Sequence, residues 1–124
     1  MADLPDAVQR FLERHIDSLE QLEILLLLRR EPGLELNPAQ VTAELRLGAG
    51  SELRLDALCA GGLLASTGDP PRYRYQASPQ LDAEVEAVAR CYAQYRVAMI
   101  SFIFSPRRDG AIRGFADAFD LRRK

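Results

Sequence analysis

Hydrophobic side chains recur with helical spacing through the first quarter of the chain. The residues that predict a first helix are spaced by four, three and one positions: Leu4, Val8, Phe11 and Leu12. Ser18 is followed three residues later by Gln21, a capping-box pattern that predicts the start of a second helix. From Leu22 to Leu28 every position but one is apolar, and a helix of that composition must be buried on most sides. We therefore predict that the second helix is the central core helix.

Two short helices and a β-hairpin are predicted next. Asn37-Pro38 supplies an N-cap and a first helical residue, and the glycine pair 61–62 is a typical helix end. An alternating piece at 34–36 fits one small strand. On the second hairpin strand, Tyr73 and Tyr75 are predicted to share one face. The predicted elements are helices over 38–47 and 51–60, separated by Gly-Ala-Gly at 48–50, and strands over 63–67 and 72–77.

A long amphipathic pattern occupies the C-terminal third. Ser78-Pro79 predicts the start of a helix, and apolar positions continue almost without interruption from 97 to 104. The stripe alternates spacings of four and three residues: Leu81, Val85, Val88, Tyr92, Tyr95, Met99 and Phe102. After Ser105-Pro106 a final amphipathic segment carries Ile112, Phe115 and Phe119. We therefore predict one long C-terminal helix followed by a shorter segment.

The middle of the chain carries a leucine-glycine pattern, Leu55-x-x-Leu58-x-x-x-Gly62-Leu63-Leu64. Together with the order of elements over 16–78, it resembles the recognition helix and wing of many bacterial winged helix-turn-helix regulators. The resemblance covers about half of the chain and implies a mainly α fold with a small β-hairpin. We expect a single domain over 1–124, with a winged-helix core at 16–78, an N-terminal helix at 1–15 and a C-terminal helical extension at 79–124.

Composition and charge narrow the function. Apolar residues make up 48% and charged residues 27%, which is typical of a soluble domain. The net charge is −2, yet residues 105–124 carry six bases and three acids, so attraction to phosphate would be strongest there. No signal-peptide pattern is present, and no apolar run approaches the roughly 20 residues that span a bilayer. Cys59 and Cys91 have no metal-ligand spacing. We expect a cytoplasmic protein without metal or cofactor.

The residues that an enzyme needs do not converge in this sequence. His15 is the single histidine, and the segment 48–50 lacks the Lys and Ser/Thr of a phosphate-binding loop. We therefore expect a protein that binds rather than catalyses.

Two binding functions fit the predicted fold. A transcriptional regulator would place the recognition helix in the DNA major groove, with Arg54 reading a guanine and the wing arginines holding phosphate. The residues predicted to be exposed for this purpose are Ser51, Glu52, Arg54 and Asp56 on the helix and Arg72 and Arg74 on the wing. However, residues 51–78 carry three bases and three acids, a poor match to DNA. The alternative is a protein–protein interaction module, or adaptor, that does not bind DNA.

The C-terminal stripe predicts an additional contact. It is longer than packing against a small core requires, so we expect it to pack partly within the chain and partly against a second copy in a homodimer. A different protein partner is the remaining alternative. The residues predicted for the dimer interface are Val88, Tyr92, Tyr95, Met99, Phe102 and Ile103. A homodimer fits both the DNA-binding and the protein-binding function.

Overall fold

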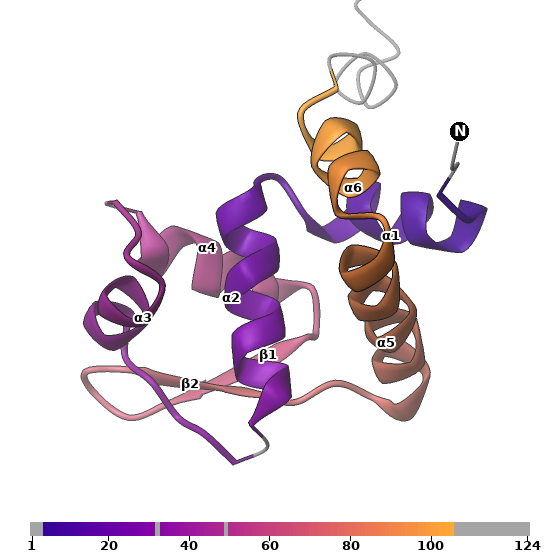
Figure 1. Cartoon of the computed structure of the whole chain (residues 1–124). Coiled ribbons are helices and arrows are strands. Elements are labelled where there is room, and N and C mark those ends of the chain that lie inside the picture. The colour runs from indigo at the N-terminus through magenta and orange to yellow at the C-terminus, as the bar shows by residue number, and fades with distance from the viewer. Residues whose placement is uncertain (1–3, 32, 49, 106–124) are drawn as a thin grey trace, which may run out of the picture.

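Figure 1 shows a computed structural model of the chain, which describes residues 4–31, 33–48 and 50–105. This part is mainly helical with one two-stranded antiparallel sheet, as the sequence predicts. The segment predicted around Ile112, Phe115 and Phe119 lies outside the described residues. In chain order the elements are α1 (Asp6–His15), α2 (Leu19–Arg30), α3 (Pro38–Leu45), α4 (Ser51–Ala60), β1 (Leu64–Thr67), β2 (Arg72–Tyr75), α5 (Pro79–Gln94) and α6 (Arg96–Ile103).

The helices begin where the capping residues predict. The Ser18 hydroxyl accepts from the backbone N–H of Gln21 at 3.2 Å. The Gln21 side chain accepts from the N–H of Asp17, one residue before the cap, so the predicted capping box of α2 forms in a shifted version. Asn37 and Gln40 make the complete reciprocal pair at the start of α3. Each cap satisfies N–H groups that a helix leaves without an internal partner.

The leucine-rich helix α2 is the central core helix, as predicted. In Figure 1 it lies between α3 and α5, with the hairpin beneath it. Its buried apolar residues are Leu22, Ile24, Leu25, Leu27 and Leu28. Leu26 is only half-buried, so one strip of the helix is not covered. Burial of five large apolar side chains on one helix is a main source of stability for a domain of this size.

The hairpin pairs Leu64 with Tyr75 and Thr67 with Arg72, so its strands are slightly shorter than predicted. The small strand expected at 34–36 is a single bridge, in which Leu36 exchanges backbone hydrogen bonds of 3.0 and 2.8 Å with Tyr73. The side chain of Tyr73 is buried and that of Tyr75 half-buried, which agrees with the predicted shared face. The hairpin therefore closes one end of the core.

The predicted long C-terminal helix is wrong in one respect, because it is broken at Tyr95. The backbone there leaves the helical region, with φ −128° and ψ 52°, and α6 begins at the next residue. The Tyr95 N–H still donates to Cys91 and its carbonyl still accepts from Met99. These two helical hydrogen bonds are kept at the break, and Met99 and Ile103, which follow it, are buried in the core. Part of the apolar run over 97–104, Met99 and Ile103, therefore belongs to the core.

Candidate binding surfaces

The start of α4 is fixed by a polar contact with α3. Gly50 occupies the N-cap position with φ 103°, a conformation that glycine adopts readily. The hydroxyls of Ser51 and Thr42 share a hydrogen bond of 2.7 Å, and Ser51 is only 3% exposed. The prediction that Ser51 is exposed for DNA contact is therefore wrong, because its hydroxyl joins α3 to α4.

Arg54 was also expected on the outer face of α4, and this placement is wrong too. Its side chain turns toward the N-terminal end of α2, where Nε donates to the Ser18 hydroxyl at 3.1 Å. The guanidinium lies 3.6 Å from the Glu20 carboxylate. The buried face of α4 is formed by Ser51, Leu55 and Leu58. Arg54 lies three residues after Ser51 and four residues before Leu58, so it is on the same side of the helix as these two. This spacing in the sequence is the signal that places Arg54 on the inner side.

The outer face of α4 carries Glu52, Leu53 and Asp56, which we call the acidic α4 face. All three are exposed, and Leu53 is exposed to 76%. The Tyr73 hydroxyl donates to Asp56 at 2.7 Å and so orients this carboxylate. Burial raises the pKa of Tyr73, and the hydrogen bond to Asp56 raises it further, so the phenol stays a donor. The face offers two carboxylates beside one large apolar side chain.

The two wing arginines differ in their surroundings. Arg72 is exposed, as predicted. Arg74 is half-buried, donates to Gln76 at 2.6 Å and lies 3.7 Å from Glu35. The hairpin therefore presents one freely accessible guanidinium and one whose charge is offset by a carboxylate.

The residues predicted for a dimer interface divide into two groups. Val88, Met99 and Ile103 are buried within the single chain, so their assignment to an interface is wrong. All three belong to the same core cluster, Val88 from α5 and the other two from α6. Tyr92 and Phe102 are half-buried, and Tyr95 is exposed. Two large apolar residues on or just after α6 that were not predicted for the interface are well exposed: Val97 at 78% and Phe104 at 66%.

A groove between α2 and α5 was not foreseen from the sequence. Its volume is about 510 Å³, and Leu45 at the end of α3 closes one side. The residues that line this α2–α5 groove are Glu23, Leu26, Arg29, Arg30, Leu45, Ala89, Tyr92, Ala93 and Arg96. The guanidinium carbon of Arg96 lies 4.6 Å from the ring centre of Tyr92, and its Nη2 lies 3.8 Å from Glu23.

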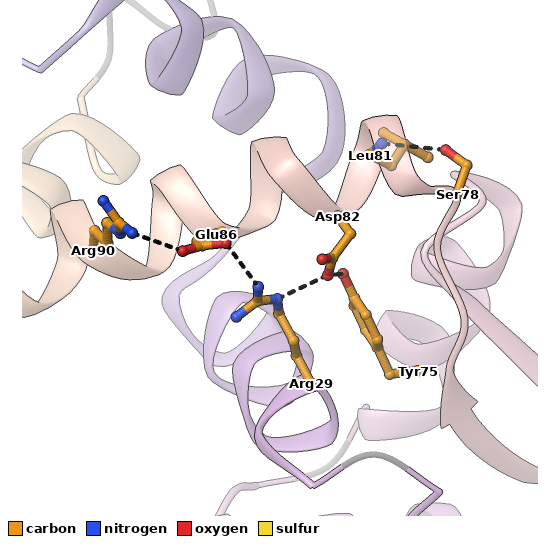
Figure 2. Close-up of polar contacts among 7 residues, drawn as sticks. All are labelled: Arg29, Tyr75, Ser78, Leu81, Asp82, Glu86 and Arg90. Atoms are coloured by element: carbon orange, nitrogen blue, oxygen red, sulfur yellow. Dashed lines mark hydrogen bonds and ion pairs between the residues drawn. The ribbon is translucent and has the colours of Figure 1, made fainter.

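Arg29, which lines this groove, also belongs to a cluster of polar contacts (Figure 2). Arg29 Nε donates to the Asp82 carboxylate at 3.0 Å, and Arg29 Nη2 lies 3.8 Å from Glu86. The Tyr75 hydroxyl donates to the same Asp82 oxygen at 2.6 Å. The hydrogen bonds from Tyr75 and Arg29 lower the pKa of Asp82. This Arg29 cluster joins α2, β2 and α5.

The groups with potential reactivity are the histidine and the two cysteines, and all three are at least half-buried. His15 is half-buried, and desolvation lowers its pKa, as does nearby Arg14. Burial raises the pKa values of the Cys59 and Cys91 thiols, which disfavours the reactive thiolate. Within residues 4–31, 33–48 and 50–105, no group of three or more His, Cys, Asp or Glu side chains is placed to hold a metal ion. In the same ranges no helix is both long and apolar enough to cross a membrane.

Comparisons with known proteins do not assign the chain to a family. No protein-family model matches it, and comparisons with curated proteins and with solved structures return no match.

Proposed function

We propose that this protein is a non-catalytic winged-helix module that binds another protein through the acidic α4 face. In this assignment α2 is the first helix, α3 and α4 form the helix-turn-helix, and β1 and β2 form the wing. The order of elements supports the assignment. The observation that carries the proposed function is the exposed surface of α4, where Leu53 is exposed beside two acids and Arg54 is turned inward.

Charge decides between protein and DNA as the partner. Proteins gain most of their affinity for DNA by neutralising phosphates with lysine and arginine. Glu52 and Asp56 would approach the phosphate backbone with the same sign of charge if α4 entered the major groove. An exposed leucine framed by charged residues instead resembles the apolar centre and polar rim of a protein interface. The partner surface that fits is an apolar socket bordered by lysine or arginine.

Site-specific crosslinking in cells tests this proposal. A photoreactive phenylalanine analogue at position 53 should form an adduct with one protein, whereas the same analogue at position 87, on the exposed side of α5, should not. The purified partner should then bind the wild-type protein at least tenfold more tightly than the Leu53→Asp and Glu52→Lys variants. Equal affinity for the wild type and both variants would remove the acidic α4 face as the interface.

DNA binding is the second candidate function, and the exposed Arg72 on the hairpin favours it. A DNA-binding regulator would act as a homodimer with recognition helices about 34 Å apart. Purified protein mixed with genomic DNA fragments at low and moderate salt distinguishes the two functions. Binding that weakens steeply with salt and disappears in Arg72→Ala would favour the regulator, and it would contradict the protein-binding proposal if Leu53→Asp had no effect.

We also propose a homodimer, through a surface that differs from the one predicted from the sequence. The exposed residues Tyr95, Val97 and Phe104 replace the buried members of the predicted stripe. Val97 lies in the first turn of α6, and Phe104 is the residue that caps its C-terminal end. Sedimentation equilibrium of the wild type and of Val97→Asp tests this surface. A wild-type dimer that becomes a monomer supports it, and a wild-type protein that is monomeric at high concentration contradicts it.

A further inference from the structure

The α2–α5 groove has the size and lining of a small-molecule site. Ligand pockets typically measure about 300 to 1,000 Å³ and combine apolar walls with a few polar groups. The groove measures about 510 Å³. Its walls carry aliphatic side chains and one aromatic ring, and its charged groups are three arginines and one glutamate.

The sequence leaves this space open through two features. Leu26 is half-buried on a helix whose other leucines in the core run are buried, so its side chain forms part of the groove wall. Ala89 and Ala93 are one helical turn apart on α5 and face the same space. Larger side chains at these two positions would close the gap between α2 and α5. An apolar ligand body would fill it in the same way.

The charges of the groove favour an anion. Arg29 is already paired with Asp82 and Glu86, so its charge is offset. Arg30 is exposed at the edge of the groove. Arg96 is held over the Tyr92 ring and lies 3.8 Å from Glu23, a distance at which a partly exposed pair contributes little. A carboxylate entering the groove would therefore meet two accessible guanidinium groups.

We propose that the α2–α5 groove binds a small amphipathic carboxylate, with its apolar body against Leu26, Ala89 and Ala93 and its charge between Arg30 and Arg96. Arginine is suited to this role because its planar donors match the two oxygens of a carboxylate. Such a ligand would contact α2, α5 and the end of α3 at once. It would hold the α2–α3 pair against the C-terminal helices. The site is separate from the acidic α4 face, so neither proposal depends on the other.

Titration of the full chain with decanoate, decanol and decyltrimethylammonium tests the charge preference. In amide-resolved NMR spectra, decanoate should shift signals of the residues that line the groove and bind at least fivefold more tightly than decanol. The cationic probe should bind most weakly. Equal binding of decanoate and decanol, or no saturable binding of decanoate, would overturn the proposal.

Variants locate the site. Ala93→Trp should fill the groove and reduce decanoate affinity at least tenfold, whereas Ala87→Trp, on an exposed position of α5 outside the lining, should leave it unchanged. Ala89→Leu serves as a second filling variant if Ala93→Trp does not fold. Arg30→Gln should reduce decanoate affinity severalfold and leave decanol affinity unchanged. Undiminished decanoate binding by a folded filling variant would place the probe elsewhere and overturn the assignment.

Discussion

Arg54 and Arg29 hold opposite ends of α2 and differ in the elements and the chemical groups that they contact. Arg54 comes from α4 and contacts the capping serine and one glutamate at the N-terminal end of α2. Arg29 belongs to α2 itself and contacts two acids of α5, one of which also accepts from Tyr75. Two residues that the sequence assigns to different tasks therefore both join helices.

The comparison shows that an arginine is placed by its position on the helix rather than by the motif around it. The resemblance to bacterial regulators implied that Arg54 reads a base, yet its neighbours on the inner face direct it to α2. Arg29 lies in the last turn of α2, where a positive charge is favourable to the helix dipole, and its position there also points it toward α5. The difference in partners predicts that removing Arg29 destabilises the fold more than removing Arg54.

The largest effect is expected for Arg29→Met, which keeps the apolar stem and removes the guanidinium. The free energy of unfolding should fall by about 1 to 2 kcal/mol, because Asp82 and Glu86 lose their cationic partner while remaining partly shielded from water. Denaturant titration followed by circular dichroism measures this change. Arg30→Met, at the adjacent and exposed position, should shift the stability by less than about 0.5 kcal/mol. Equal losses in both variants would show that the Arg29 cluster contributes nothing specific.

A smaller loss, about 1 kcal/mol, is expected for Arg54→Met, because its Nε donates to a neutral hydroxyl and its ion pair with Glu20 is longer than the one between Arg29 and Asp82. The same titration measures it. Glu20→Gln in the Arg54→Met background should add little, since the pair is already broken. A variant Arg54→Met that is as stable as the wild type but binds DNA more weakly would support the base-reading role of Arg54. It would contradict the view that Arg54, like Arg29, mainly joins helices.

Local sequence signals predicted most of the fold. Ser18, Asn37 and Ser78 each mark a helix start because their side chains satisfy free N–H groups, a contact confined to neighbouring residues. The leucine run predicted the central helix, and the tyrosine alternation predicted the hairpin faces. These patterns are local, so they need no knowledge of distant partners.

Features that depend on distant residues were missed. The break at Tyr95 has no proline or glycine to signal it, and the heptad-like spacing continues across it. The α2–α5 groove requires residues from three helices and becomes visible only when the helices are placed. The inward orientation of Arg54 had a local signal in the sequence, but it was still missed. The spacing from Ser51 to Leu58 contained the signal, but the resemblance gave that helix face a different role.

His15, unlike the two arginines, has a buried ring nitrogen without a hydrogen-bond partner among the described residues. Its Nε2 is buried and makes no hydrogen bond to the described residues, while Nδ1 lies 2.8 Å from where a Cβ on Gly61 would stand. Burial and Arg14 lower the pKa of His15, and Glu84 opposes them. Stability should therefore be complete above the ordinary histidine pKa of about 6.5 and fall as pH drops from there through the folded-state pKa. The loss should be smaller than that of Arg54→Met because the ring is only half-buried.

Unfolding titrations between pH 5 and 8 in the wild type and in His15→Phe measure this dependence. The variant should lack the fall in stability below the histidine pKa. Asp82 provides a contrast, because its lowered pKa gives a stabilisation that is complete above the ordinary aspartate value of about 3.9 and is lost as pH falls below it, so Asp82→Asn should leave the slope between pH 5 and 8 unchanged. A wild-type profile that is flat from pH 8 to 5 would contradict the assignment to His15.

The smallest effect is expected for Arg90→Met. Arg90 donates to Glu86 at 2.9 Å, a shorter contact than the one between Arg54 and Glu20, yet the Arg90 side chain is 77% exposed and its partner lies on the same helix. Water screens such a pair, and it joins no separate elements, so the loss should stay within about 0.5 kcal/mol. If Arg90→Met lowered the free energy of unfolding as much as Arg54→Met, the distance between the charged groups would determine how much these arginines contribute to stability. Burial and the connection between helices would then matter less. Denaturant titrations of the two variants under one buffer condition decide between these explanations.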